Sequence, residues 1–179
     1  PEPESESISK LDTPGSSGSL DYSPDAQPAE SAVDPEIVEI FLEEVDEVLE
    51  ALAAQLPDWS QSLGSEVPLK ELRRGFHTLK GSGRIVGANQ IGELGWALEN
   101  MLNRLLDGTI EATEDHLFLV KHACQLIPLL RADFAQGETA ERLDLENLLE
   151  QVDLLASGGT LTKYRVSASG ETAVSPQAP

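Results

Sequence analysis

Apolar residues recur at intervals of three and four between residues 34 and 156. This period puts them on one face of an α-helix and predicts that the face packs into a core. Five segments carry it: 34–57, 68–86, 89–108, 113–134 and 139–156. No segment has the two-residue alternation of a half-buried strand. The pattern predicts an all-α fold, an antiparallel bundle of about five helices with a four-helix core.

Each expected helix has its own stripe of residues predicted to be buried. In chain order the stripes are Val38, Phe41, Val45, Val48, Leu52 and Leu56; Leu69, Leu72, Phe76 and Leu79; Ile91, Leu94, Leu98, Met101 and Leu105; Leu117, Val120, Cys124, Ile127 and Phe134; and Leu145, Leu148, Val152 and Leu155.

Capping residues predict where three of the helices begin. Asp34 followed by Pro35 combines an N-cap with a proline at the first helical position. Asn89 and Thr113 are of the residue types that cap helices, and we expect them to cap the third and fourth helices.

Proline and glycine predict where helices end. We expect Pro57 to end the first helix, which leaves residues 57–66 as a loop whose Trp59 covers one end of the bundle. Gly87 suits the left-handed position after the second helix. Pro128 falls inside the fourth helix and should kink it or split it in two.

The two ends of the chain differ in composition from its middle. Residues 1–33 and 157–179 are rich in Pro, Ser, Gly, Thr, Ala and acidic residues and show no apolar period. Such segments bury too little apolar surface to offset chain entropy, so we expect disordered linkers on either side of one domain at 34–156. Because the sequence lacks an initiator methionine, we expect it to be a piece of a longer protein.

The chain is strongly acidic, with 12 Lys and Arg against 32 Asp and Glu and a formal net charge of −20. This balance argues against nucleic acid as a partner, because such binding neutralises phosphates. Cys124 is the only cysteine, so no internal disulfide is possible and a reducing compartment is expected. There is no long apolar run and no leader, so we expect a soluble, cytoplasmic protein without membrane insertion.

Against this acidic background, one histidine stands among cations. His77 lies about 100° round the helix from Phe76, off the apolar stripe. The positions three, four and seven residues away share its face. They hold Arg73, Arg74, Lys80, Gly81 and Arg84. The segment 70–84 contains five of the chain's twelve cations and a single acid, so the positive patch is local.

Two glycines close to His77 need an explanation, since each costs a helix interior about 1 kcal/mol relative to alanine. Gly81 lies one turn beyond His77 and removes a side chain that would overhang the ring, while Gly83 would permit close helix packing. Lys and Arg make charge-assisted hydrogen bonds to phosphoryl groups, and imidazole is a competent nucleophile. We therefore interpret His77 as a phosphorylatable histidine.

The run His77-Thr78-Leu79-Lys80-Gly81-Ser82-Gly83, with Gly87 further on, resembles the motif of histidine phosphotransfer (HPt) domains. The segment 96–102 is similar to the next block in HPt domains of chemotaxis-type sensor kinases. The resemblance implies that Glu99, 22 residues after His77, hydrogen-bonds and orients the imidazole. Trp96 stands where those kinases often have a second histidine. Among them, the hybrid kinases of pilus-linked (twitching motility) systems are the most similar.

The resemblance implies a phosphorelay intermediate. His77 would accept a phosphoryl group from a histidine kinase catalytic domain or a phospho-receiver and pass it to an aspartate of a response regulator. Lys80 and the three arginines would offset the phosphoryl charge. The chain has no glycine-rich nucleotide loop and no metal-ligand cluster, so ATP and Mg²⁺ would come with the partner domains and no autokinase activity is expected. Two alternatives remain open, a non-catalytic helical scaffold and a pseudo-HPt module that binds partners without transfer.

Other reactive residue types have simpler interpretations. His116 and His122 are six residues apart, which does not match the i, i+4 spacing of a two-histidine metal site, and we expect both on the surface. Cys124 belongs to an apolar stripe and is expected to be a small buried hydrophobe rather than a nucleophile.

Overall fold

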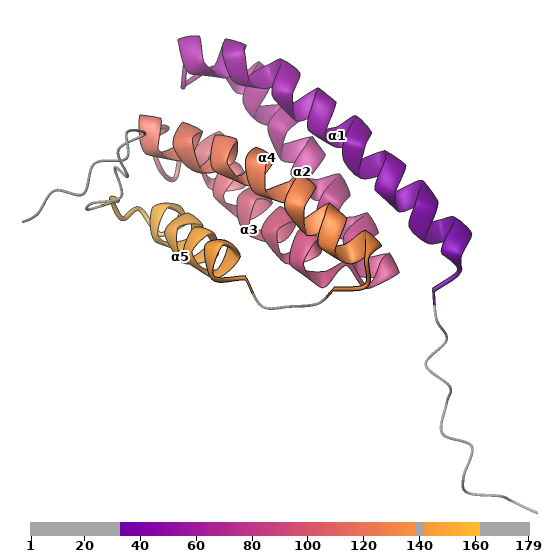
Figure 1. Cartoon of the computed structure of the whole chain (residues 1–179). Helices are drawn as coiled ribbons and strands as arrows, with labels where there is room; N and C mark the ends of the chain where they lie inside the picture. The colour runs from indigo at the N-terminus through magenta and orange to yellow at the C-terminus, as the bar shows by residue number, and fades with distance from the viewer. Residues whose placement is uncertain (1–32, 139–141, 162–179) are drawn as a thin grey trace, which may run out of the picture. The chain divides into compact units, whose positions relative to one another are not determined.

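The computed structural model describes residues 33–138 and 142–161, which form five α-helices (Figure 1). They are α1 (Pro35–Gln61), α2 (Glu66–Val86), α3 (Asn89–Leu106), α4 (Glu114–Ala135) and α5 (Leu143–Ala156). These described ranges contain no strand, so the predicted all-α fold is confirmed. Apart from Val33 and residues 157–161, the expected linkers lie outside the described residues.

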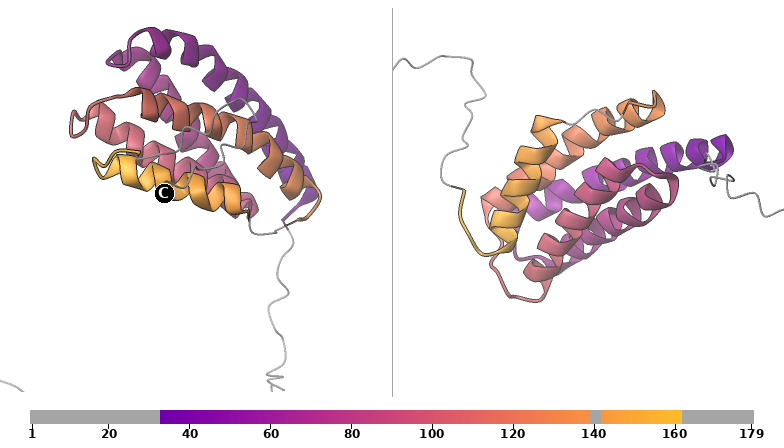
Figure 2. Two further views of the ribbon diagram at one scale, coloured as in Figure 1. Left: turned by 60° about the vertical axis from the view of Figure 1, so that its left-hand side comes forward. Right: turned by 90° about the horizontal axis from the view of Figure 1, so that it is seen from below.

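The first four helices surround a common core. α2 packs against α1 and α3, α4 packs against α1 and α3, and α5 covers the side formed by α3 and α4. Figures 1 and 2 show α1 and α5 on opposite sides of this arrangement. Successive helices run antiparallel because their connections are short, and the α2–α3 turn contains only Gly87 and Ala88. The predicted antiparallel bundle is therefore confirmed.

The five stripes read from the sequence supply the core. Leu72, Phe76, Leu79, Leu94 and Leu98 have no exposed surface, and the stripes of α4 and α5 are buried in the same way. Five residues of the predicted stripes are half-buried instead: Val38, Val48, Leu56, Cys124 and Phe134. Within the described ranges, no helix is long and apolar enough to traverse a lipid bilayer.

Pro57 does not end α1, so the predicted loop at 57–66 is wrong over its first part. The helix continues to Gln61 with Pro57 inside it, although an internal proline costs about 3 kcal/mol. Trp59 offsets that cost because its side chain is fully buried and its indole N–H donates to the carbonyl of Leu63 at 3.0 Å. Burying an aromatic side chain of this size contributes a comparable free energy.

Two other predictions about the helices are wrong, and a third lies partly outside the described residues. Asn89 is the first residue of α3 and does not cap it, since the N-cap position is Ala88. Pro128 does not split α4, which is continuous from Glu114 to Ala135. The predicted start of the last helix at Thr139 lies outside the described residues, and α5 begins at Leu143. By contrast, Gly87 has the expected left-handed conformation, with φ of 79°.

His116 is not a surface residue, contrary to the sequence-based expectation, because it is 4% exposed. Thr113 is the N-cap of α4, and its backbone N–H donates to His116 Nδ1 at 3.2 Å. The Thr113 hydroxyl lies 2.8 Å from the same nitrogen. The histidine thus takes the part of the Glu or Gln in a capping box, and this role draws its ring into the bundle.

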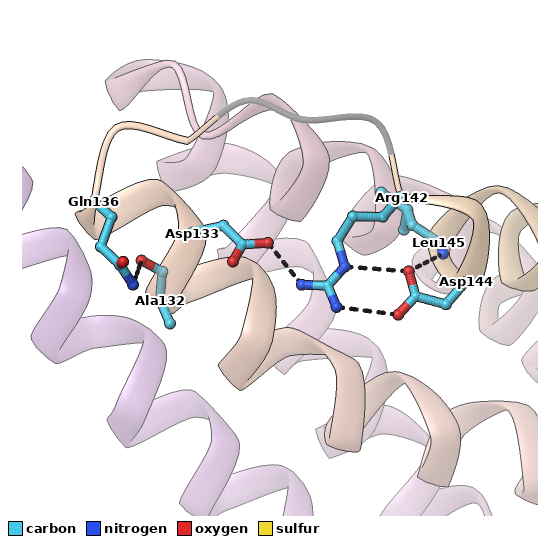
Figure 3. A network of polar contacts seen from close by, with 6 residues as sticks. All are labelled: Ala132, Asp133, Gln136, Arg142, Asp144 and Leu145. Carbon is cyan, nitrogen blue, oxygen red and sulfur yellow. Dashed lines mark hydrogen bonds and ion pairs between the residues drawn. The ribbon is translucent and has the colours of Figure 1, made fainter.

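An arginine ties the start of α5 to the end of α4 (Figure 3). Arg142 Nη1 donates to Asp133 of α4 at 2.6 Å, and its Nε and Nη2 reach the carboxylate of Asp144 at 3.2 and 3.3 Å. These hydrogen bonds raise the pKa of Arg142 above its already high ordinary value. The contacts fix where α5 begins and so help place it over α3 and α4.

Candidate functional site

The site is built where α2 and α3 come closest, and glycines make that approach possible. A Cβ on Gly95 of α3 would lie 2.8 Å from the backbone nitrogen of Lys80 and 2.9 Å from the carbonyl oxygen of Phe76. A Cβ on Gly83 would lie 3.1 Å from the backbone nitrogen of Gly92. Such distances leave no room for a side chain, so the two backbones are in direct contact over this stretch. The packing role expected for Gly83 is therefore confirmed.

Close approach brings Glu99 of α3 against two of the predicted site residues on α2. Its Oε1 lies 2.9 Å from Nδ1 of His77, and its Oε2 lies 2.6 Å from Nζ of Lys80. The Glu99 side chain is only 9% exposed, whereas that of His77 is 58% exposed. A buried carboxylate thus holds the inner edge of a ring whose outer edge faces solvent.

Two opposing influences act on the pKa of Glu99. Burial alone raises it, while the hydrogen bonds and charges of Lys80 and His77 lower it, and together these contacts bring it below its ordinary value of 4.5. Glu99 is therefore ionised at neutral pH. An ionised carboxylate can only accept hydrogen bonds.

The tautomer of His77 follows from that charge. Because Glu99 Oε1 can only accept, Nδ1 of His77 must carry the proton in their 2.9 Å hydrogen bond. In the neutral ring, Nε2 then has a free lone pair. Because Nδ1 faces the buried Glu99 and 58% of the His77 side chain is exposed, the arrangement presents a nucleophilic nitrogen to an incoming group.

The surroundings of Nε2 are open on the side of Gly81. Gly81 is exposed, and a Cβ built on it meets no atom within 4 Å. It therefore has no packing reason to be glycine, unlike Gly83, Gly92 and Gly95. The free space lies one helical turn from His77, as the sequence led us to expect.

The predicted cationic residues divide into two groups. Arg73 and Lys80 turn toward Glu99, with Arg73 Nη2 3.9 Å and Lys80 Nζ 2.6 Å from its carboxylate oxygens. Arg74 is 79% exposed and lies 4.0 Å from Glu71, while the exposed Arg84 packs its Cγ near Gly92. The buried carboxylate of Glu99 therefore compensates part of the positive charge around His77.

Sequence reasoning missed the contribution of Gly92 and Gly95. Both are buried in the interior of α3, where each glycine costs about 1 kcal/mol relative to alanine. Their spacing of three residues places them on one face of α3, the face that meets α2. Two glycines on one face inside a helix were the sequence signal that could have predicted this close packing. Without them Glu99 could not reach His77.

Three comparisons with known proteins show what the chain is similar to. The profile of the Hpt domain family matches residues 36–157. The chemotaxis protein CheA of Halobacterium salinarum is 30% identical over 80 residues, which are 45% of this chain and 12% of that protein. The chain thus spans only a small part of this relative.

A solved structure shares the fold. It is the phosphorylated P1 domain of CheA3 in complex with CheY6 from R. sphaeroides, with a TM-score of 0.63 and 18% identity. The likeness covers 70% of this chain and 98% of that one. With the family profile covering all five helices, the chain belongs to the Hpt domain family of phosphotransfer domains.

Proposed function

We propose that His77 is the residue that carries the phosphoryl group, in a relay between a histidine kinase and a response regulator. The observation that supports this most directly is the hydrogen bond between Nδ1 and Glu99, which leaves Nε2 unprotonated and exposed. His116 has the opposite arrangement, since its Nδ1 accepts from Thr113 and the residue is buried. Of these two histidines, only His77 offers a nucleophilic nitrogen to a partner.

The transfer balances without a separate proton carrier. The Nε2 lone pair of His77 attacks phosphorus as the bond from phosphorus to the donor's leaving oxygen breaks. The ring keeps its proton on Nδ1 and becomes positively charged, and the adjacent Glu99 carboxylate stabilises that charge. In the second step a carboxylate oxygen of the acceptor aspartate attacks phosphorus, and the P–N bond breaks to return the lone pair to Nε2.

Lys80 can pair with two anions in this cycle, the Glu99 carboxylate and the phosphoryl group. It pairs with Glu99 at 2.6 Å in the unphosphorylated domain, and its side chain remains 23% exposed. A flexible ammonium at this place can also donate to a phosphoryl oxygen on Nε2. Arg73, Arg74 and Arg84 add longer-range positive potential, and Gly81 leaves space for the partner.

The partners implied are the ATP-binding catalytic domain of a kinase and the receiver domain of a response regulator. The Mg²⁺ that assists in-line phosphoryl transfer would be held by those domains. A CheA P1 domain of similar fold has been solved in complex with CheY6, which supports a receiver as one partner.

The experiment separates the chemistry from the identity of the partner. We expect incubation with phosphoramidate, a small phosphodonor, to give one acid-labile phosphoryl group, detected by ³¹P NMR and intact mass. His77→Gln should abolish it, whereas the control His122→Gln, which is also on a helix but half-buried, should retain it. Labelling of His77→Gln to the wild-type extent would disprove the assignment.

The two alternatives predict other outcomes. A non-catalytic scaffold would bind a partner domain and never acquire label from phosphoramidate or from any kinase. A pseudo-HPt module would bind a receiver domain but pass no label to it. Transfer of label from the phosphorylated domain to a purified receiver domain excludes both.

We further propose that residues 34–156 form the module, and that it belongs to a cytoplasmic hybrid kinase of a pilus-linked chemosensory system. The similarity of the Trp96–Leu102 run to HPt domains of chemotaxis-type sensor kinases, among which those of pilus-linked systems are the most similar, supports the second point. Limited proteolysis should trim the chain to 34–156. In the host, His77→Gln at the chromosomal locus should impair twitching and leave flagellar swimming intact; the reverse result would point to another system.

A further inference from the structure

Trp96 is a large aromatic residue left exposed beside the phosphorylation site. Trp96 is 51% exposed, although tryptophan usually buries most of its surface. It precedes Glu99 by one turn of α3, and its neighbour Gly95 is in contact with the backbone of Lys80. Trp96 therefore follows directly after the residue that contacts α2, one turn of α3 from the Glu99 that bonds His77.

A shallow groove of about 160 Å³ opens next to the indole, between α3 and α5. Its apolar lining comes from Trp96, Ala97, Leu149, Val152 and Ala156. Glu93 and Asp153, both exposed, stand at its polar edges together with Asn100. The groove is large enough for one apolar side chain of a partner.

Three kinds of surface thus belong to neighbouring helices. The cations Arg73 and Lys80 of α2 contact Glu99, the indole of Trp96 lies one turn before Glu99 on α3, and the carboxylates of Glu93 and Asp153 line the apolar groove beside that indole. A complementary partner would present an acidic site, an apolar side chain and a basic residue. A receiver domain has an aspartate as its phosphoacceptor and so supplies the first of these.

We propose that Trp96 and the α3–α5 groove form the specificity contact for the response-regulator receiver domain, which seats there an apolar side chain flanked by Lys or Arg. The inference rests on the proposed phosphotransfer from His77, and it adds where the acceptor binds and how it is selected. Exposed tryptophans are over-represented among the residues that dominate the binding energy of protein interfaces.

The two tryptophans of the chain make the contact directly observable. Trp59 is fully buried at the end of α1, so its emission is insensitive to binding at the surface. Trp96 is half-exposed, and enclosure by a partner shifts its emission to shorter wavelength. A Trp96→Phe variant removes the signal and identifies its source.

The decisive experiment measures two reactions on the same variants, in the full chain. The first is phosphorylation of His77 by phosphoramidate, and the second is transfer to the receiver domain that reacts fastest among those purified from the host. For Trp96→Ala we expect an unchanged first reaction and a rise in the receiver's KM of about 10-fold or more, with kcat unchanged. Trp96→Tyr should restore most of the loss.

Phe118→Ala is the matched control, because Phe118 is an aromatic residue of similar exposure, 48%, on α4, which does not contact α2. It should leave both reactions unchanged. The pair Glu93→Gln and Asp153→Asn should also raise KM and weaken its dependence on salt, as expected if the partner contributes a cation.

Each remaining outcome counts against the inference. Normal receiver transfer by Trp96→Ala, with His77 still phosphorylated, overturns it and leaves the proposed function intact. A loss confined to phosphorylation by the kinase would assign the groove to the donor instead of the receiver. If phosphoramidate does not phosphorylate the wild-type chain at all, the proposed function itself is refuted.

Discussion

Two histidines of this bundle show how neighbours decide the chemistry of one side chain. His77 lies in the middle of α2 with 58% of its side chain exposed, while His116 lies in the first turn of α4 and is 4% exposed. At His77 a carboxylate accepts from Nδ1, so the lone pair is on the exposed Nε2. At His116 a backbone N–H donates to Nδ1, so the proton is on the buried Nε2. The two rings therefore have opposite tautomers.

The difference lies in whether a ring serves the fold or a partner. His116 uses its lone pair to satisfy a donor at a helix end, and nothing reactive remains. The Nδ1–H of His77 donates a hydrogen bond to a carboxylate from the neighbouring helix, and the lone pair of the ring is left on the other nitrogen. We expect the ¹⁵N shifts of the two imidazoles to show these opposite protonation patterns, and equal patterns would invalidate the comparison.

The largest effect is expected from filling the space beside His77. Gly81→Leu adds a side chain where no atom lies within 4 Å, so the domain should be as stable as the wild type or more so. Transfer from a kinase and to a receiver should fall by at least about 100-fold, because the reacting groups can no longer align. Gly95→Ala is the contrasting variant, since its Cβ would meet the α2 backbone and lower stability by about 1–3 kcal/mol. Normal transfer by Gly81→Leu would contradict the account of this glycine.

Removing the charge of Glu99 should have the next largest effect. In Glu99→Gln the amide can either accept from Nδ1 or donate to it, so His77 is no longer held in one tautomer. We expect phosphorylation by phosphoramidate to slow by about 10- to 100-fold, by analogy with the carboxylates that orient metal-binding histidines. The ¹⁵N spectrum should show a mixture of tautomers at His77 and no change at His116. An unchanged rate would mean that Glu99 has only a structural role.

The capping role of His116 predicts an effect on stability alone. His116→Leu keeps the apolar contacts but leaves the Thr113 N–H without its acceptor, so the free energy of unfolding should fall by about 1–3 kcal/mol. His116→Gln, which supplies the usual capping-box acceptor, should lose less. Denaturant unfolding measures both, and phosphorylation of His77 should be normal in each. Impaired phosphorylation in a folded His116 variant would break the distinction between the two regions.

The smallest expected effect is a dependence of stability on pH. Burial lowers the pKa of His116 below its ordinary 6.5, against a weaker opposing influence of Asp115. The unfolded chain therefore binds a proton first as the pH falls, so the contribution of the neutral ring is complete above pH 6.5 and is lost below it. The free energy of unfolding should decrease as the pH falls from 7.5 to 5.5 in the wild type, and it should decrease less steeply in His116→Gln.

Much of the fold could be predicted because it depends on periodicity. The residues of the five stripes needed only their spacing to be assigned to the core, and Gly87 needed only its freedom to adopt a positive φ. Where long-range packing competes with a local signal, the prediction failed. Pro57 is a strong local stop, yet the burial of Trp59 carries α1 past it.

The candidate site divides in the same way. Residues on α2 could be grouped around His77 from helical geometry alone, while Glu99 was reached only through resemblance to a family. Its contact with His77 depends on Gly92 and Gly95, which let two helix backbones touch and which have no local meaning in the sequence. The direction of Arg73, toward Glu99 at 3.9 Å, was equally out of reach.

By itself, the sequence determined that the chain folds into antiparallel helices, that one face of the second helix carries a histidine among cations, and that a glycine clears its surroundings. These features follow from the 3.6-residue period and from residue chemistry, both of which act locally. Tertiary structure alone decided which nitrogen of His77 keeps its lone pair, whereas the partner of His116 is the nearby Thr113 of the same capping box. For His77 the partner comes from another helix, and only the packed glycines of α2 and α3 allow it within 2.9 Å.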